Sequence, residues 1–379
     1  MQNKELLTVT KTFGTPVYVY DKQMIIEQYH KLSNAFSGFK HQIHYAMKAN
    51  ENPEILKILL NEGAKIDTVS PNEIRRALSV GFKPQDIIFT PSFPSSKDID
   101  FAFEQNVHLH IGELECLQYI IDNHKDKVVG LRINPANSIE GNQKIATAHQ
   151  DSKFGIPVSK LDKIFDFMKQ GLKVDALHIH TGSDVKNWKD LTKSVDVLFN
   201  LVKDFPDVKF LDFGSGFKVQ YKENDAEIDL TAYANHIKNK LKNCQRDLII
   251  QFEPGKFLVS KAGYLLVRVN AVKQGYQKQF AGVNSGFHHL IRPMYYDAYH
   301  EIINLSNPNG KLQKYDVVGQ LCEEDTFAYD RLLPEVKKGD ILAIKNAGAY
   351  GFSMVSNYNL RDKPKEILWD KNKAKDISL

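Results

Sequence analysis

The sequence has few cysteines, and no apolar run in it is long. The three cysteines, Cys116, Cys244 and Cys322, show no Cys-x-x-Cys spacing, which argues against a disulfide framework and a structural zinc site. No segment approaches the roughly 20 apolar residues that cross a bilayer. The first residues, MQNKELLTVTK, lack the apolar core of a secretory signal. We therefore expect a cytoplasmic protein in a reducing compartment.

Neither sign of charge dominates the sequence. The 50 basic and 46 acidic residues give a formal net charge of +4, and no long basic run interleaved with aromatic residues occurs. Nucleic-acid binding therefore has no support. The 379 residues include 42% hydrophobic and 25% charged residues, near the averages for soluble globular proteins, so we expect a sizeable core. The length exceeds that of one ordinary small domain.

Short apolar runs alternate with helical patterns between residues 42 and 254. Segments such as PEILKILLNEG and NEIRRALSVG have helical spacing and separate eight candidate strands. Eight strand-then-helix units predict a (β/α)8 TIM barrel of the α/β class, whose active site lies at the carboxyl ends of its strands. The candidate strands are QIHYAM, AKIDTV, DIIFT, VHLHI, VVGLRIN, VDALHIH, VKFLDFG and LIIQFEP.

The pattern changes after Gly255. Short strands separated by turn residues, such as GYLLVRVNAVKQ and GDILAIKNAGAY, predict a second, all-β domain built as a barrel or sandwich. We expect the segment TPVYVYD to add a strand to it. The expected division is 1–30 for the strand segment that joins the β domain, 31–258 for the cofactor-binding barrel, and 259–379 for the β domain. The 134–152 loop after the fifth barrel strand is long enough to act as a lid.

A lysine stands at the end of the first barrel strand, in HYAMKAN. Lysine is rarely buried without a partner, so Lys48 either extends to solvent or is held in a pocket for chemistry. Its position at the carboxyl end of a barrel strand makes it a candidate catalytic residue.

The sixth strand ends in HIHTGSD, where His178 and His180 lie on one face because they are two residues apart. A metal pair is one interpretation, but it needs further His or carboxylate ligands at other strand ends. Those ends offer mostly glycines, Ser183, Lys48 and Glu253. An imidazole followed by Gly and Ser suits a ligand with an aromatic ring and a phosphate.

The seventh strand ends in DFGSGF, where Gly214 and Gly216 flank Ser215 and allow backbone N–H groups to approach an anion. Phosphate sites after the seventh and eighth strands are common in this barrel.

The eighth strand ends in FEPGKF, which places Glu253 at the mouth, followed by Gly255 and Lys256. A lysine, an imidazole, a glycine turn for phosphate and a carboxylate together predict a pyridoxal phosphate site. Lys48 would bind the cofactor covalently, and Glu253 would keep its pyridine nitrogen protonated.

With these motifs in order, the chain resembles the fold-type III pyridoxal-phosphate-dependent decarboxylases, which share the alanine racemase-like fold. The resemblance covers nearly the whole chain, and eight short motifs in the same order make it specific. They are HYAMKAN, SKFG, HIHTGS, GSGF and EPG in the barrel, followed by RPMYYDAYH, CEEDTFA and GAYGFSMVSNYN.

The resemblance implies a role for each matching residue. Lys48 and Cys322 are the implied catalytic residues, and Cys322 and Glu323 are implied to reach the active site of the neighbouring subunit in a homodimer. Lys256 stands where the family usually has arginine, which keeps the charge but loses the bidentate fork. The implied cofactor-binding residues are Lys48, His180, Ser183, Gly214, Ser215, Gly216, Glu253, Gly255 and Tyr350. The implied substrate-binding residues are Lys256, Arg292, Tyr296, Glu323 and Tyr350.

The implied reaction is decarboxylation of meso-2,6-diaminopimelate to L-lysine and carbon dioxide, the last step of lysine biosynthesis, with Cys322 or Lys48 as proton donor. Enzymes that decarboxylate ornithine, lysine or carboxynorspermidine are the alternative. Glu323 together with Arg292 favours a substrate with both a distal amine and a distal carboxylate. Two further interpretations are a non-enzymatic pyridoxal-phosphate-binding regulator and a metal-dependent hydrolase that uses the histidine pair.

Overall fold

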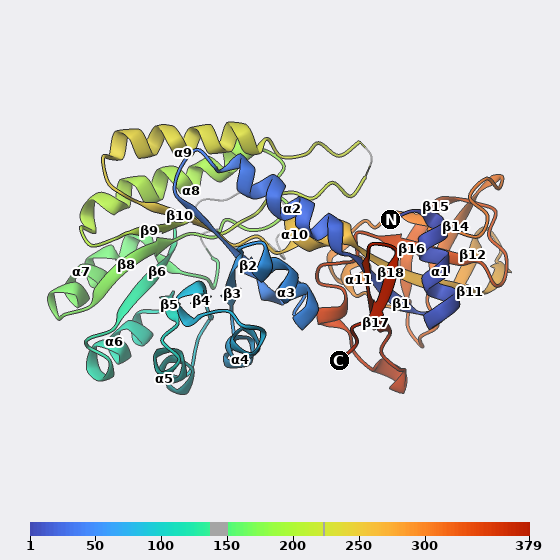
Figure 1. The fold of residues 1–379 in the computed structure, drawn as a ribbon, viewed down its shortest axis with the longest axis horizontal. Coiled ribbons are helices and arrows are strands. Elements are labelled where there is room, and N and C mark those ends of the chain that lie inside the picture. The colour runs from blue at the N-terminus through green and yellow to red at the C-terminus, as the bar shows by residue number, and fades with distance from the viewer. Residues whose placement is uncertain (137–150, 223) are drawn as a thin grey trace.

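The computed structural model describes residues 1–136, 151–222 and 224–379. It has two bodies, a parallel barrel on the left of Figure 1 and a β-rich domain on the right. Most of the loop predicted to act as a lid, 134–152, lies outside the described residues.

Eight parallel strands form a closed barrel, which confirms the predicted fold. Their order is β5-β4-β3-β2-β10-β9-β8-β6, and the ring closes because β5 also pairs with β6. The short strand β7 (Ile156–Pro157) extends the sheet beside β6. The barrel strands are β2 (His41–Ala46), β3 (Lys65–Thr68), β4 (Ile87–Phe89), β5 (His108–Ile111), β6 (Val128–Asn134), β8 (Lys173–His178), β9 (Phe210–Asp212) and β10 (Ile249–Phe252).

Helices surround the barrel (Figure 1), and their ends follow local sequence signals. The helix Pro71–Val80 begins after Ser70, whose side chain accepts a hydrogen bond from the Glu73 N–H, and ends at Gly81 in the left-handed conformation. The surrounding helices are α2 (Lys22–Ala35), α3 (Pro53–Asn61), α4 (Pro71–Val80), α5 (Ser96–Glu104), α6 (Leu114–Asn123), α7 (Leu161–Lys169), α8 (Trp188–Leu201), α9 (Leu230–Cys244) and the short α10 (Lys256–Val259).

The β domain contains a nine-stranded sheet with the path β15-β14-β12-β11-β1-β17-β18, from which β16 and β13 branch beside β11. Two helices belong to this domain, α1 (Asn3–Phe13) and the short α11 (Arg292–Tyr296). The sequence pattern did not predict α1, and α2 runs across residue 30. The strands are β1 (Val17–Asp21), β11 (Gly263–Gln274), β12 (Gln279–Val283), β13 (Ile302–Asn304), β14 (Leu312–Val318), β15 (Thr326–Pro334), β16 (Ile341–Lys345), β17 (Lys365–Asp370) and β18 (Lys373–Asp376).

The strand β1 lies in the interior of this sheet, antiparallel to β11 and parallel to β17. Its alternate side chains enter two different cores. Tyr18 and Tyr20 belong to the large core that continues into the barrel, whereas Val17 and Val19 pack in a smaller core that includes Leu6 of α1. The two faces of β1 therefore join both bodies of the molecule.

Two hydrogen bonds tie the β domain to the end of β2. The Ala49 carbonyl accepts one from the Tyr350 N–H at 2.8 Å and one from the Ser353 hydroxyl at 3.3 Å. Residues from both domains consequently surround the carboxyl end of the first barrel strand.

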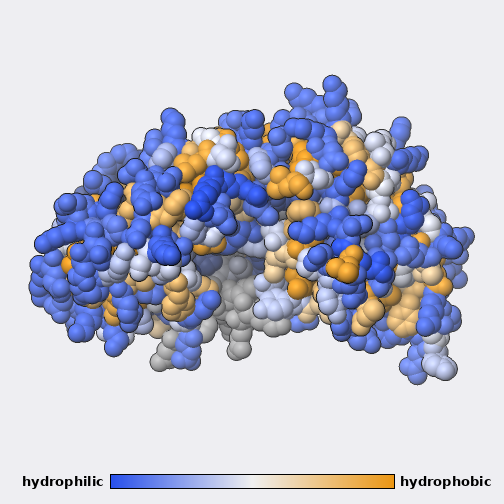
Figure 2. Space-filling view, turned by 90° about the horizontal axis from the view of Figure 1, so that it is seen from below, coloured by the Kyte–Doolittle hydropathy of each residue, from blue (hydrophilic) through white to orange (hydrophobic). Residues whose placement is uncertain are grey.

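Hydrophilic residues dominate the face shown in Figure 2, and hydrophobic ones occur in small scattered groups. Among the described residues, no helix combines the length and the apolar character that crossing a membrane requires.

Candidate active site

A cavity of about 480 Å³ lies between the carboxyl ends of the barrel strands and the β domain. Residues from both domains line it, including most of the predicted site residues. Those predicted residues are Lys48, His180, Ser183, Ser215, Gly216, Glu253, Gly255, Lys256, Arg292, Tyr296 and Tyr350.

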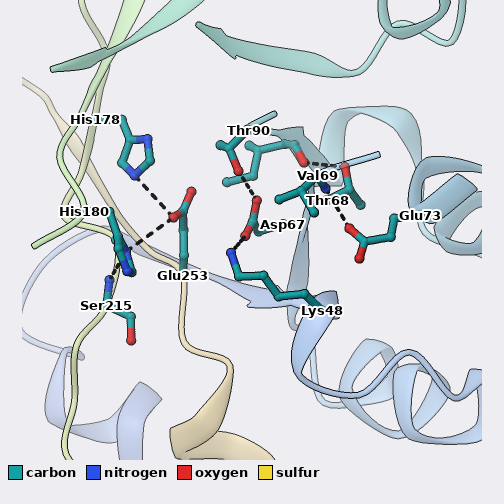
Figure 3. Close-up of polar contacts among 12 residues, drawn as sticks. Lys48, Asp67, Thr68, Val69, Glu73, Thr90, His178, His180, Ser215 and Glu253 are labelled. Atoms are coloured by element: carbon teal, nitrogen blue, oxygen red, sulfur yellow. Dashed lines mark hydrogen bonds and ion pairs between the residues drawn. The ribbon is translucent and has the colours of Figure 1, made fainter. Parts of the chain in front are cut away.

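Lys48 lies in a short 3-10 turn, Met47–Ala49, directly after β2. Its side chain remains 44% exposed and its Nζ lies 3.5 Å from Oδ2 of Asp67, a fully buried residue of β3 (Figure 3). The Thr90 hydroxyl donates a hydrogen bond to the other Asp67 oxygen. Burial, and then the charge on Glu253, raises the pKa of Asp67 to about 7, against the opposing effect of Lys48. Burial acts to lower the pKa of Lys48, but Asp67 outweighs it and holds that pKa above its ordinary value.

Two imidazoles contact the Glu253 carboxylate, which is only 5% exposed. The Nε2 atom of His178 lies 3.3 Å from Oε2 of Glu253, and Nδ1 of His180 lies 4.0 Å from the same oxygen. Burial acts to raise the pKa of Glu253, but His178, His180 and Lys48 outweigh it and hold the pKa well below its ordinary value. Glu253 is therefore ionised, and its other oxygen, Oε1, has no hydrogen-bond partner among the described residues.

His180 lines the cavity as a neutral imidazole, because burial and then the charge on Arg132 lower its pKa to about 3. Its Nδ1 accepts a hydrogen bond from the Ser215 N–H at 3.3 Å. The ring packs against Gly214, where φ is +58° and any side chain would collide with the imidazole. Only glycine suits this position, which explains how the glycine turn and the imidazole share one wall.

The turn after β9 packs against the turn after β8. Gly216, with φ of +125°, carries no side chain, and a Cβ there would lie 3.0 Å from the Gly182 carbonyl oxygen. The Val185 N–H donates a hydrogen bond of 2.8 Å to the Gly216 carbonyl. Ser183 therefore lines the cavity next to Ser215 and Gly216, so two serine side chains and a glycine turn meet on one wall, a combination that suits an anion.

Two further buried cations line the cavity, and their surroundings differ. Lys256 is 8% exposed and forms a short ion pair with Asp184. Arg292 is 4% exposed; its Nη2 donates to the Tyr221 hydroxyl at 3.3 Å, and its guanidinium lies 5.7 Å from the Tyr296 ring. Among the described residues, no carboxylate lies within ion-pair distance of Arg292.

Three predicted site residues do not line this cavity: Gly214, Cys322 and Glu323. Gly214 packs against His180, whereas Cys322 and Glu323 are exposed. The Glu323 carboxylate accepts a hydrogen bond from the Tyr358 hydroxyl at 2.7 Å, and the Cys322 N–H donates to the Asn359 side chain at 3.3 Å. Within one chain, they belong to the surface of the β domain.

The cavity also contains charged residues that the sequence analysis did not single out. Arg132 lies on β6 with its guanidinium 4.6 Å from the Phe154 ring, and Asp184 follows β8. Asp67 adjoins the cavity through Lys48. A charged residue inside an apolar strand was the available signal for Asp67 in AKIDTV and Arg132 in VVGLRIN. No such signal marks Asp184.

His178 and His180, which the sequence offered as a pair of metal ligands, do not form one group of ligands in the structure. His178 contacts His110 and Glu253 in the barrel interior, and these three residues offer ligand atoms within 4.8 Å of one another. His180 instead faces the cavity. The Glu253 carboxylate lies within ion-pair distance of both His178 and His180.

The residues present fit a pyridoxal phosphate molecule. The cavity offers an accessible lysine amine, a neutral imidazole for ring stacking and glycine turns for a phosphate. The unpartnered Oε1 of an ionised, buried Glu253 matches the need of a protonated pyridine nitrogen. The fold and the site together define a barrel-type pyridoxal phosphate enzyme.

Comparison with known proteins supports the assignment of a pyridoxal phosphate enzyme. Residues 22–260 match the model of the pyridoxal-dependent decarboxylase family, pyridoxal binding domain. The chain belongs to this family and is an enzyme that uses pyridoxal phosphate.

Proteins named diaminopimelate decarboxylase are similar over nearly the whole chain. The protein of Methanothermobacter thermautotrophicus is 35% identical over 94% of this chain and 87% of its own length. That of Campylobacter jejuni is 35% identical over 96% of this chain and 92% of its own.

Solved structures agree as well. The crystal structure of diaminopimelate decarboxylase from Helicobacter pylori complexed with L-lysine has a TM-score of 0.91 and 33% identity, covering 98% of this chain and 96% of that one. A lysine/ornithine decarboxylase of Vibrio vulnificus, at 21% identity and a TM-score of 0.85 over 97% of this chain and 98% of its own, shares the fold.

Proposed function

We propose that this chain removes one carboxylate from meso-2,6-diaminopimelate and releases L-lysine and carbon dioxide, as the last step of lysine biosynthesis. The relatives named above support this reaction. The observation that carries it is Arg292, a buried guanidinium on the cavity wall with no carboxylate within ion-pair distance among the described residues. A buried cation without a counter-ion is costly unless a ligand brings the anion. A substrate with a second carboxylate supplies one.

Pyridoxal phosphate, when bound, supplies an aldehyde for the substrate amine and a protonated ring that accepts the electrons of the breaking carbon–carboxylate bond. Lys48 would hold the cofactor covalently, and Asp67 keeps its amine in the cavity. Glu253 would hold the proton on the ring nitrogen. His180 would stack on the ring, and the turn around Ser215, whose N–H donates to His180, would bind the phosphate.

The β-domain side of the cavity binds the distal end of the substrate. Arg292 and Tyr296 stand four residues apart on α11 and both line the cavity, so a carboxylate is offered a charged donor and a hydroxyl together. Lys256 also lines the cavity, where its pair with Asp184 offsets its charge. Arg292 is then the principal receptor for the distal carboxylate.

We further propose that the enzyme is a homodimer in which Cys322 and Glu323 complete the cavity of the partner chain. Their exposure on the β-domain surface, away from the cavity of their own chain, supports this arrangement. Glu323 would bind the distal ammonium, and Cys322 or Lys48 would return a proton to the substrate carbon.

The shared site is testable by complementation. Inactive Lys48→Ala and inactive Glu323→Ala chains, once mixed under conditions where subunits exchange, should regain activity because one site of each mixed dimer has both groups intact. Failure to recover, with exchange proven by tagged chains, would contradict a shared site.

A direct assay tests the reaction. The purified protein with pyridoxal phosphate should release carbon dioxide and L-lysine from meso-diaminopimelate, and act much more slowly on ornithine and L-lysine. Activity should survive chelator treatment, since the His110, His178 and Glu253 group has no role as a metal site in this proposal. Preference for ornithine or L-lysine, or no carbon dioxide from any amino acid, would overturn it.

A further inference from the structure

His178, the last residue of β8, lies deep in the site and is 1% exposed. It does not line the cavity; it lies behind Glu253, whereas His180, two residues later, reaches the cavity wall. Figure 3 shows both imidazoles converging on one carboxylate. A role for His178 must therefore act through Glu253.

The two oxygens of Glu253 have different surroundings. Oε2 receives the contacts from His178, at 3.3 Å, and from His180, at 4.0 Å. Oε1 is buried and has no hydrogen-bond partner among the described residues. A buried carboxylate oxygen without a donor is unfavourable. Burial, and then the charge on Glu253, raise the pKa of the nearby Asp212 carboxyl well above its ordinary value, and Oδ2 of Asp212 has no hydrogen-bond partner among the described residues either. A further donor that bonds Oε1 would therefore stabilise this group. The ring nitrogen of the cofactor is such a donor.

The imidazole of His178 suits this task because it is neutral. Burial lowers its pKa, although Glu253 opposes the effect. A neutral imidazole has one N–H, and only the tautomer with that proton on Nε2 can direct it at Oε2 of Glu253, which lies 3.3 Å away in an orientation that falls short of full hydrogen-bond geometry. A neutral donor orients the carboxylate and leaves its full charge for the ring proton, which a lysine or arginine here would offset.

The imidazole of His110, which packs beside His178, does not supply a competing charge. The ring centroid of His178 lies 5.5 Å from that of His110, whose pKa burial holds well below its ordinary value. Nδ1 of His178 has no hydrogen-bond partner among the described residues. The contact with Glu253 is thus the principal polar interaction of this side chain.

We propose that His178 is a positioning residue that turns Glu253 so that Oε1 faces the cofactor's ring nitrogen while Oε2 is held from behind. This inference rests on the proposed use of pyridoxal phosphate. It distinguishes the two histidines of HIHTGSD, which are identical as residue types, by what each one contacts.

Two substitutions make a matched pair for the test. The amide nitrogen of glutamine reaches as far along the side chain as Nε2 of histidine, whereas that of asparagine reaches only as far as Nδ1. His178→Gln should therefore keep the donor to Glu253, and His178→Asn should lose it. Both keep a polar amide in the barrel interior, so a general loss of packing would affect both.

The measurement is the affinity of each protein for pyridoxal phosphate and for its deaza analogue, in which a C–H replaces the ring nitrogen. His178→Asn should bind pyridoxal phosphate about 10-fold more weakly, the effect of one hydrogen bond to a charged group, and bind the analogue as the parent does. His178→Gln should match the parent for both. Glu253→Gln should lose the same preference, and adding His178→Asn to it should cause no further loss.

Equal weakening for both cofactor forms, or equal behaviour of the two His178 variants, would overturn the proposal. Stoichiometric bound metal that disappears in His178→Gln would also overturn it. If His178→Asn does not fold, judged by its thermal melt, His178→Met replaces it as the variant without a donor. Failure of the parent to bind pyridoxal phosphate at all would instead contradict the proposed function.

Discussion

The cationic side chains on the two sides of the cavity differ in whether a carboxylate of the same chain lies beside them. On the barrel side, Lys48 lies beside Asp67 and Lys256 beside Asp184, so each lysine has a carboxylate from the same chain. On the β-domain side, Arg292 has tyrosine neighbours, and no carboxylate is within ion-pair distance among the described residues. The charges of these two lysines are therefore offset before anything binds, whereas no carboxylate of the described residues offsets the charge of Arg292.

This difference indicates different functions for the lysines and for the arginine. A balanced lysine is held in place for covalent chemistry or packing without attracting every anion. An unbalanced arginine selects for an anion, and a substrate without one leaves it unsatisfied. We therefore expect substitutions on the barrel side to change catalysis and stability, and substitutions on the β-domain side to change selectivity.

The largest expected effect is at Lys48. Lys48→Ala should lower the catalytic rate by on the order of 10³-fold or more, because the residue that binds the cofactor covalently is lost. Borohydride reduction of the parent followed by peptide mapping should place the cofactor on the peptide that contains Lys48. Lys48→Arg is the matched control, since it keeps a cation beside Asp67. Covalent attachment at another lysine in either variant would show that the charge pair, and not the amine, is what Lys48 provides.

Arg292→Ala should cost about 2–5 kcal/mol in transition-state binding of meso-diaminopimelate, the range for removing one partner of a buried charge pair. Turnover of L-lysine, which has no distal carboxylate, should change little. The measurement is the ratio of kcat/KM for the two substrates in the parent and the variant. An equal fall for both would mean that Arg292 supports the fold or the cofactor, and the contrast between the two sides would fail.

The Lys256–Asp184 pair should stabilise the protein without any ligand. Asp184→Asn and Lys256→Gln should each lower the free energy of unfolding by about 1–2 kcal/mol, and the double variant should regain most of the loss, since the pair is broken only once. Arg292→Gln is the comparison: it removes a cation that has no counter-ion among the residues the structure describes, and it should leave stability equal or higher. Denaturant unfolding of ligand-free protein measures all four. Additive losses at 184 and 256 would contradict the pairing.

Substitution of Glu366 should have an effect only at high pH, and it tests a carboxylate of the β domain that neutral groups hold. The Tyr20 hydroxyl and the Asn52 amide donate to it at 2.7 and 3.0 Å, and burial raises its pKa from 4.5 to about 7. The folded protein then keeps a proton that the unfolded chain loses, so this group's contribution to stability falls as pH rises from about 4.5 to 7. Glu366→Gln should match the parent near pH 5 and exceed it at pH 8 by on the order of 2 kcal/mol. Melting temperatures that shift in parallel at both values would contradict this.

The sequence sufficed for the barrel because each of its strands is a short apolar run bounded by turn signals. The segment VVGLRIN, for example, is β6 from its first to its last residue. The sequence did not suffice for α1, because only Leu6, Val9 and Thr10 of NKELLTVTKTF are buried. The surface that buries the helix comes from distant strands such as β11.

Some features of the site could likewise be predicted from the sequence, and others could not. Lys48, His180, Glu253 and the glycine turn stand next to strand ends, where a barrel collects its polar residues, and the structure brings them into one cavity. Asp184 and Lys256 are 72 residues apart, and no local pattern links them. The orientation of Glu253 depends on a contact behind it, which only coordinates reveal.

The position of β1 has a consequence for how the chain is made. Residues 17–20 are almost completely buried, yet the two strands that flank them, β11 and β17, begin at Gly263 and Lys365. At synthesis rates of 5–20 residues per second, β1 leaves the ribosome roughly 20 to 70 s before its last neighbour, β17. Two valines and two tyrosines without a sheet over that time are a ready binding site for a chaperone. The sheet of the β domain is therefore complete only when β17 has paired with β1.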